Sequence, residues 1–524
     1  MPLTSFPPRS PLLAAAALCC ALSGCTVGPK YHPSAPQAPS AYKEAPGKVP
    51  AKPAPPAATL PDPTLGGLGN WTVAQPQDSQ MRGEWWEIYN DPELNALEAQ
   101  LNIDNQNIRQ FFENFMAARA LVRQARTQLF PTATAGFSYS RSRGSANLLN
   151  TTGATGSTSA GAGSTFIDLP LGASWEPDLW GKIRNTVHQA QYSAQLSAAD
   201  LEGERLTEQA SLATYFFELR GQDALRQILD ATVAADQKAL DLTRSLYDTG
   251  LTDQISVVQA ENALESAQSE ATNLGIARAQ YEHAIAVLVG KAASDFSIPG
   301  KAILTTPPPI PVGLPSQLLE RRPDIAGAER AMAAANAQIG IAYAAYYPNV
   351  SLSASGGFES SAWKHLLAWP SRFWSVGPSV SETIFDAGLR RAVVNQYVAA
   401  YNAGLAAYRQ TVLSAFQQVE DSLAALRILT QQIQQQHRAV ESARLALDLE
   451  TKRYETGLDP YIDVVTEQNS LLAAQQVLAE IEIQRMTASV QLIEALGGGW
   501  NRSQLPTPQQ VTAKPTQAET TIQQ

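Results

Sequence analysis

The sequence predicts an α+β membrane protein with internal duplication, in which long paired helices are joined to a few β-strands. The first observation is a near-repeat: Tyr247–Leu264 and Tyr454–Leu471 share nine residues at a fixed offset of 207 positions, and a fixed period indicates duplication. The second observation is a set of long proline-free spans. The third is a set of short stretches in which every second residue is apolar. The duplication predicts two copies of the same turn, each between two predicted helices.

The N-terminus has the pattern of a secretory signal over residues 1–24. Arg9 lies in the n-region, Leu12–Leu22 is an apolar run, and small residues follow it. Leu22-Ser23-Gly24-Cys25 resembles a bacterial lipobox, which implies cleavage before Cys25 and a covalent lipid there, diacylglycerol with an acyl chain such as palmitate. Thr26, in place of Asp, favours the outer membrane. The alternative is a plain signal peptide cut at small residues.

Composition divides the rest of the chain into four parts. Residues 25–80 are rich in Pro and Ala and predict a lipid-anchored, extended arm, because Pro interrupts helices and central strands. Residues 81–300 and 301–500 are the two repeats. Residues 501–524 are rich in Gln, Thr and Pro, and predict a disordered tail.

Long helices are predicted where proline is absent and helix-forming residues prevail. A helix over Lys182–Tyr247 would be roughly 100 Å long, which favours coiled-coil-like packing over a globular core. The predicted helices are Pro92–Leu129, Lys182–Tyr247 and Thr252–Val289 in the first repeat, and Ile325–Tyr346, Gly388–Tyr454 and Pro460–Leu496 in the second.

Four stretches alternate with a period of two, as strands with one apolar side do: Thr132–Ser140, Phe166–Trp175, Asn349–Phe358 and Arg372–Ile384. Their length suits tilted transmembrane strands. Four strands cannot close a barrel, and open edges are costly in lipid. Two copies would give eight strands and little lumen, whereas three would give twelve and a channel.

Several classes of protein are disfavoured by what the sequence contains. The net charge is −10 without a basic stripe, so we expect no nucleic-acid partner. After removal of the signal the cysteine count falls to Cys25 alone, and the five His are scattered, so we expect no metal site and no cofactor. The GGG at 497–499 lacks the Lys-Ser/Thr of a phosphate loop. We expect no enzymatic activity.

Four motifs carry a family resemblance. Residues 318–352, residues 174–185, the duplicated Tyr-x-Thr-Gly-Leu turn and ALGGGW at 495–500 resemble TolC-type outer-membrane factors of the OprM/NodT lipoprotein branch. The resemblance covers Cys25 to about Trp500. It implies a homotrimer with four strands per protomer in a twelve-strand trimeric β-barrel and a long helical periplasmic tunnel.

The resemblance also implies a function and partners. The chain would be the outer-membrane exit duct of a tripartite efflux system for small molecules such as antibiotics. Its partners would be a periplasmic adaptor, an inner-membrane pump of the RND class and outer-membrane lipid. Two alternatives stay open: an exit duct for type I protein secretion, and a lipid-anchored coiled-coil scaffold without a pore.

The duplicated turns are predicted to end one helix and start the next. Gly250 and Gly457 suit the left-handed residue after a helix. Thr252 and Asp459 suit N-caps, and Pro460 suits the first helical position. By resemblance these tips, with Leu251 and Leu458, are where an adaptor or pump docks.

The second turn carries the candidate gate. Ile462 matches the apolar constriction of the family, and Asp463 follows it where the first repeat has Ser256. Many relatives have Asp where this chain has Thr466, so Asp463 or Glu467 is a candidate for the acidic ring, or the gate is mainly apolar. Equally, Asp463 suits a solvated acid at a helix start.

Overall fold

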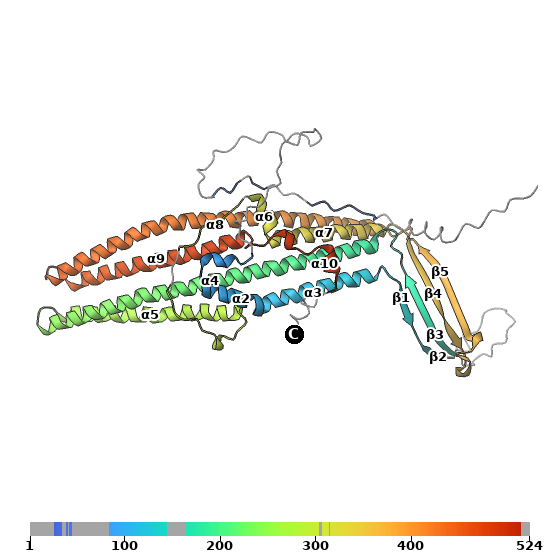
Figure 1. Ribbon diagram of the computed structural model, residues 1–524, viewed down its shortest axis with the longest axis horizontal. Coiled ribbons are helices and arrows are strands. Elements are labelled where there is room, and N and C mark those ends of the chain that lie inside the picture. The colour runs from blue at the N-terminus through green and yellow to red at the C-terminus, as the bar shows by residue number, and fades with distance from the viewer. Residues whose placement is uncertain are drawn as a thin grey trace, which may run out of the picture.

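The computed structural model describes residues 26–33, 38, 39, 41–44, 83–143, 164–302, 306–313 and 315–514. The predicted signal peptide and Cys25 lie outside these residues. Figure 1 shows a long layer of helices joined at one end to an antiparallel sheet, with two helical hairpins at the opposite end. The chain therefore has the predicted α+β architecture.

The helices confirm the duplication. Helices α4 (Lys182–Asp248) and α8 (Leu389–Glu455) have 67 residues each, and α5 (Gln254–Leu288) and α9 (Tyr461–Ala495) have 35 each. Helices α3 (Gln106–Thr127) and α7 (Pro323–Ala344) have 22 each. At 1.5 Å per residue the longest helices extend for about 100 Å. Each half therefore pairs one long helix with shorter helices laid along it.

The prediction of one helix over Pro92–Leu129 was wrong. The chain forms α2 (Pro92–Asp104) and α3, separated by Asn105 in an extended conformation. The Asn105 side chain accepts a hydrogen bond from the Ile108 amide at 2.9 Å and donates one to the Leu288 carbonyl at 2.9 Å. The break therefore caps α3 and attaches it to the end of α5. Two further short helices are η1 (Trp85–Tyr89) and α6 (Pro315–Arg321).

The sheet has the strand order β1/β2, β3, β4, β5, all antiparallel. The strands are β1 (Thr132–Ala135), β2 (Ser138–Ser142), β3 (Ser164–Trp175), β4 (Asn349–Ser360) and β5 (Arg372–Ser381). The four predicted strands are present, with two differences. The last ends at Ser381, before Ile384. The first is interrupted at Gly136, whose amide donates to the Pro170 carbonyl at 2.9 Å while Pro170 has no N–H to return the bond.

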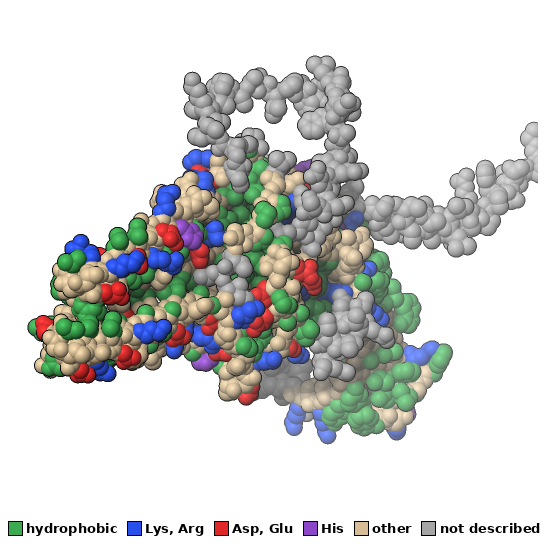
Figure 2. Space-filling view, turned by 60° about the vertical axis from the view of Figure 1, so that its left-hand side comes forward, with side chains coloured by type: hydrophobic (Ala, Val, Ile, Leu, Met, Phe, Trp, Pro, Cys, Tyr) green, Lys and Arg blue, Asp and Glu red, His purple; other side chains and the backbone are tan. Residues whose placement is uncertain are grey.

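The pairing register places most of the apolar residues of the strands on one face, with Phe166 and Phe373 on the other. Ala133 pairs with Ala173, which pairs with Ala354, which pairs with Val376. This face carries, among others, Phe137, Tyr139, Ile167, Leu169, Leu171, Leu352, Phe358, Trp374, Val376 and Val380, and the opposite face is largely Ser, Thr and Gly. Hydrophobic side chains gather over the strands in Figure 2, while charged ones are spread over the helices.

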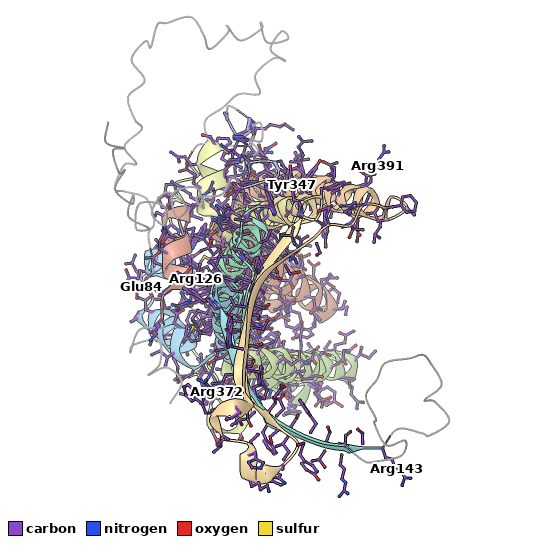
Figure 3. The ribbon with its side chains drawn as sticks, turned by 90° about the vertical axis from the view of Figure 1, so that its right-hand side faces the viewer. Glu84, Arg126, Arg143, Tyr347, Arg372 and Arg391 are labelled. Carbon is purple, nitrogen blue, oxygen red and sulfur yellow. The ribbon has the colours of Figure 1, made fainter. Side chains whose placement is uncertain are left out.

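The sheet bends along its length. Figure 3 shows the strands curving from Tyr347, beside the helices, to Arg372 and Arg143 at the far end. There Trp363 stacks on Phe137 and Tyr139, with ring centroids 5.9 and 5.8 Å apart. Strands β1/β2 and β5 are the two edges of the sheet. On its outer side, neither edge pairs with another strand among the described residues.

The largest core cluster lies midway along the helical layer, where η1, α2, α4, α5 and α9 meet. Its members include Trp85, Leu94, Leu101, Leu212, Phe216, Ile285, Val490 and Ile493. Among the described residues, no helix is both long enough and apolar enough to cross a membrane.

The C-terminal segment differs from the predicted tail. Residues 501–514 are folded and include α10 (Pro508–Thr512), in which Val511 is fully buried against Val122 and Ala194. Arg119 donates to the Ala513 carbonyl at 3.1 Å, and Gln195 donates to the Pro506 carbonyl at 2.8 Å. The Pro/Gln-rich composition therefore wrongly predicted disorder for these residues, because side chains of α3 and α4 donate hydrogen bonds to their backbone carbonyls.

The described parts of the N-terminal arm lie on the helices. Tyr42 is buried in a cluster with Leu318 and Ile325. The amides of Lys43 and Glu44 donate to the carboxylate of Glu420 at 2.7 and 3.0 Å. Burial and hydrogen bonds therefore hold residues 42–44 against α6, α7 and α8.

Candidate functional site

Both duplicated turns have the same backbone. Gly250 and Gly457 each have φ of 74°, as predicted for the left-handed position. The amide of each Gly donates to the carbonyl of the Tyr three residues earlier at 2.9 Å. The amide of the following residue, Leu251 or Leu458, donates to the carbonyl five residues earlier, also at 2.9 Å. This pair of bonds is a Schellman motif, in which a left-handed residue, favoured as Gly, ends the helix.

The predicted N-caps were wrong in both turns. Helix α5 is capped by Asp253, whose carboxylate accepts from the Ser256 amide at 3.0 Å, and not by Thr252. Helix α9 has Pro460 at its N-cap position, without a side-chain cap, and not at the first helical position predicted for it. Asp459 instead accepts hydrogen bonds from Arg453, which explains why its carboxylate does not cap α9.

The second turn contains a cluster of charged residues. The Arg453 guanidinium bonds Asp459, with Nη2 3.0 Å from Oδ1, and lies 3.9 Å from Glu450. The hydrogen bond from Arg453 lowers the pKa of Asp459. The neighbouring Asp459 carboxylate, followed by burial, raises the pKa of Glu450. One cation therefore serves two carboxylates at the end of the hairpin.

The gate candidates lie beside this cluster on the first turns of α9. Ile462 is 42% exposed, and Asp463 and Thr466 are also exposed. The Thr466 hydroxyl donates to the Ile462 carbonyl at 2.8 Å, so it is held against the helix. Glu467 is half-buried. Asp463 is close enough to Glu450 and Arg453 to raise the pKa of both.

An apolar cluster holds the two hairpins together near their tips. Tyr461 and Val464 of α9 pack with Leu240 of α4 and with Ala260 and Leu264 of α5. By contrast, Leu251 and Leu458 at the tips are 75% and 71% exposed. The two tips therefore form one end surface, with apolar side chains presented to solvent beside the charged cluster.

Two members of the charged cluster, Glu450 and Arg453, were missed by sequence reasoning. The repeat held the signal that could have found them. At the offset of 207 residues their counterparts are Thr243 and Leu246. At these positions one copy of the turn has a charged residue and the other has an uncharged one. The turn itself therefore does not need the charge.

Residues of the two motifs 174–185 and 318–352 meet at the junction of helices and strands. Trp180 donates to the Pro348 carbonyl at 2.8 Å and stacks on Tyr347 with ring centroids 4.9 Å apart. The Val27 amide donates to the Trp180 carbonyl at 3.1 Å, and Thr26 packs against Gly181. Cys25 itself lies outside the described residues, but the next residue is fixed at this junction.

Residues 90–291 and 314–498 match the family described as outer membrane efflux protein. The toluene efflux pump outer membrane protein TtgC of Pseudomonas putida is 32% identical over 418 residues, which cover 79% of this chain and 85% of that protein. The probable efflux pump outer membrane protein SepC, from another strain of Pseudomonas putida, is 31% identical over 490 residues, which cover 93% of this chain and 96% of that protein.

The solved structure of the outer-membrane channel OprN superposes with a TM-score of 0.77 at 28% identity. The match covers 91% of this chain and all of that one. Sequence and fold therefore agree over nearly the whole described chain.

Proposed function

This chain belongs to the outer membrane efflux protein family, and we propose that three copies of it form the exit duct of a tripartite system that exports small molecules across the outer membrane. The chain is an outer-membrane channel protein that works in efflux. One observation carries the proposal. A sheet that is apolar on one face and unpaired at both edges is joined to a helical layer about 100 Å long.

The open sheet edges support the trimer. Each copy supplies four strands, counting β1 and β2 as one interrupted strand. Unpaired N–H and C=O groups at β5 and β1/β2 would each cost several kcal/mol in lipid. Pairing β5 of one copy with β1/β2 of the next removes both edges, and three copies give a twelve-strand barrel with an open lumen.

The contacts of Thr26 support a lipid on Cys25. The backbone hydrogen bond of Val27 and the packing of Thr26 hold the chain beside Trp180 and Tyr347. Aromatic side chains of this kind are enriched at membrane interfaces. A lipid on Cys25 would thus enter the membrane at the level where the strands begin. Mass spectrometry of the mature N-terminus would show the lipid on Cys25, and an unmodified Cys25 would contradict it.

The second-repeat turn is the proposed gate. In a trimer, three copies of Ile462 and Asp463 would face one another at the end of the tunnel. The residues exposed along this helix face, Ile462, Asp463 and Thr466, are available for that contact. Like charges near the axis would repel one another and favour cations. Opening would require the two hairpins to move apart.

The exposed tips of the two hairpins are the surface that we propose for binding the partner proteins. Leu251 and Leu458 offer exposed apolar contacts, and Gly250, Thr252, Gly457 and Asp459 complete the surface proposed for an adaptor and a pump, here of the RND class. The duct has no energy source of its own, so these partners must supply the work of opening by binding the open state more tightly.

Oligomeric mass and conductance together test this proposal. We expect the purified protein to have the mass of a trimer in native mass spectrometry and to give small, rare openings in planar bilayers, because the isolated gate is closed. A trimer that never conducts, even after the gate residues are removed, would favour the scaffold without a pore. A monomeric or dimeric mass would contradict the twelve-strand barrel.

A further inference from the structure

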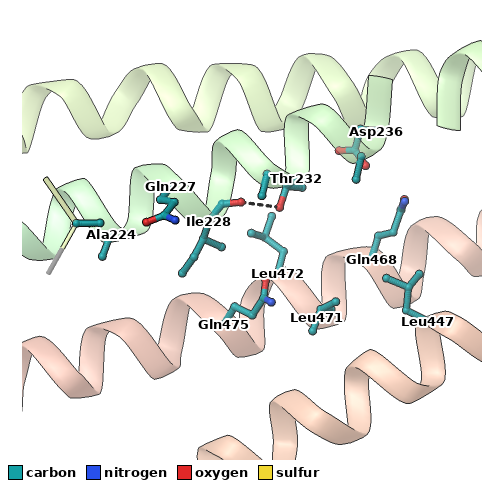
Figure 4. A pocket seen from close by; sticks show the side chains of 13 residues that line it. Ala224, Gln227, Ile228, Thr232, Asp236, Leu447, Gln468, Leu471, Leu472 and Gln475 are labelled. Carbon is teal, nitrogen blue, oxygen red and sulfur yellow. Dashed lines mark hydrogen bonds between the residues drawn. The ribbon is translucent and has the colours of Figure 1, made fainter. Parts of the chain in front are cut away.

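An open cavity of about 540 Å³ lies between α4 and α9, away from the tips (Figure 4). It separates the long helix of the first repeat from the short helix of the second, within one chain. Its walls are formed by Ala224, Gln227, Ile228, Ala231, Thr232, Ala235 and Asp236 of α4, Leu447 of α8, Gln468, Leu471, Leu472 and Gln475 of α9, and Ala302.

One end of this cavity holds buried polar groups without partners. Asp236 is 5% exposed, and no side-chain hydrogen bond or ion pair joins it to any other described residue. Gln468 lies opposite, at the same end in Figure 4, and its Oε1 is buried without a hydrogen bond. Tyr461 does not line the cavity, but its hydroxyl is also buried without a partner, and burial followed by the charge of Asp236 raises its pKa.

These groups call for a hydrogen-bond donor that carries positive charge. A buried carboxylate without a partner is unfavourable, and burial accordingly raises the pKa of Asp236. An ammonium group offers three donors and no acceptor, so it can satisfy the Asp236 carboxylate on the cavity wall. The remaining wall, with Ile228, Leu471 and Leu472, is apolar.

We propose that this cavity binds a small amphipathic amine, with its ammonium group at Asp236 and its apolar body against Ile228, Leu471 and Leu472. The volume falls within the range of sites for drug-sized ligands. An anion would be repelled by Asp236. A metal ion would find one carboxylate on the cavity wall, and a neutral apolar molecule would leave that carboxylate unpaired.

The position of the cavity gives such a ligand a structural consequence. The ligand would touch α4 of the first repeat and α9 of the second, and would fix their separation. Gln476 of α9 already donates to Glu270 of α5 at 2.7 Å, close to the same seam. An amine bound there would add a further link to the contacts that already join the two hairpins.

The test is a fluorescence titration of the full-length protein, held in amphipol, with dansylcadaverine. This probe joins a primary ammonium to an apolar fluorophore that brightens when water is excluded. We expect saturable binding that Asp236→Asn weakens by roughly tenfold or more, as the loss of a charge-assisted hydrogen bond does. Asp241→Asn is the matched control on the same helix: Asp241 is exposed, lies outside the cavity, and its loss should leave binding unchanged.

A second variant and a second probe separate recognition of the charge from binding of the apolar body. Ala231→Phe should fill the cavity and abolish binding, with circular dichroism and oligomeric mass confirming that the variant is folded. The N-acetylated probe, which has no charge, should bind weakly to every variant. Equal binding of both probes, or native affinity in Asp236→Asn, would show a site for neutral amphiphiles and overturn the proposal. These readouts do not depend on channel activity, so they can fail or succeed independently of the proposed duct.

Discussion

The two duplicated turns share a backbone but differ in their charges. Gly250 and Gly457 have the same φ, and both turns have the same Schellman hydrogen bonds at the same 2.9 Å distances. The side chains diverge around this common frame. The second turn has Glu450, Arg453, Asp459 and Asp463 where the first has Thr243, Leu246, Thr252 and Ser256.

This difference separates what the turn requires from what it leaves free. A helix that reverses direction in this way needs a left-handed residue and paired backbone groups, and both copies keep them. The exposed side chains contribute little to the turn itself, so the second copy could acquire charges at four positions where the first copy has uncharged residues. The charges lie next to Ile462 and Asp463, which supports assigning the gate to the second turn alone.

The largest expected effect comes from removing the proposed constriction. Ile462→Ala with Asp463→Ala should raise the conductance of the isolated channel several-fold in planar bilayers, because side chains that narrow the tunnel would be lost. The matched control is Ile255→Ala with Ser256→Ala, the same positions in the first turn, which should leave conductance near the native value.

Either of two results would contradict this asymmetry. Unchanged conductance in the Ile462/Asp463 variant would rule those residues out as the gate. Equal increases in both variants would mean that the two turns close the tunnel together, and that the charge difference has another role.

Crosslinking tests the position of the second turn directly. A single Cys at position 463, in a chain whose mature form otherwise keeps Cys25, should link neighbouring protomers through a short thiol reagent. A disulfide needs α-carbons within about 7 Å, so linkage reports close approach at the axis. The Cys25 thiol would be blocked if it carries the proposed lipid.

The control places the Cys at position 256 in the first turn. We expect much less linkage there, because the first turn would lie farther from the axis. Dimers and trimers on a denaturing gel measure the outcome. Linkage at 256 and not at 463 would transfer the gate to the first repeat.

The sequence predicted the long helices and strands well, because their signals are local and repeated. Proline-free spans of helix formers and alternating stretches continue over many residues. The errors came from single side chains with distant partners. Asn105 divides the first helix by bonding α5, and Val511 anchors the described residues 501–514 by packing on Val122 and Ala194.

At the candidate site, too, local features were predicted correctly and side-chain partners were not. The glycines were predicted because φ depends on the residue itself. The N-caps were not, because Asp459 is drawn to Arg453, and because Asp253, one residue after Thr252, provides the cap in the first turn. Competition between partners of this kind cannot be decided from spacing alone.

A smaller effect is expected from exchanging the charge at one position. Arg453→Leu gives the second turn the residue of the first, and removes the cation shared by Asp459 and Glu450. The hydrogen bond from Arg453 lowers the pKa of Asp459, so in the native turn this carboxylate stays ionised until the pH falls below its ordinary value of about 4. Without Arg453, Asp459 should take up its proton at a higher pH.

Bilayer recordings of reversal potential at several pH values measure this change. At neutral pH, Arg453→Leu should be more cation-selective than the native channel, because Asp459 loses the cation that neutralises it. That excess should decline as the pH falls through about 4, where free carboxylates are protonated. Leu246→Arg is the reciprocal control and should not change selectivity. Identical selectivity in all three channels would place the charged cluster away from the ion path.

The last prediction concerns a change that should have the same effect in both turns. Gly250→Ala and Gly457→Ala each force a β-carbon into a left-handed conformation, at a cost of roughly 1–2 kcal/mol. An added Cβ would meet no atom within 4 Å at either position, so the cost is that of the backbone alone. Hydrogen exchange of the hairpin amides should therefore speed up by a similar factor, about 5 to 30, in each variant. Unequal factors would show that the charged cluster, and not the shared backbone, sets the stability of the second turn.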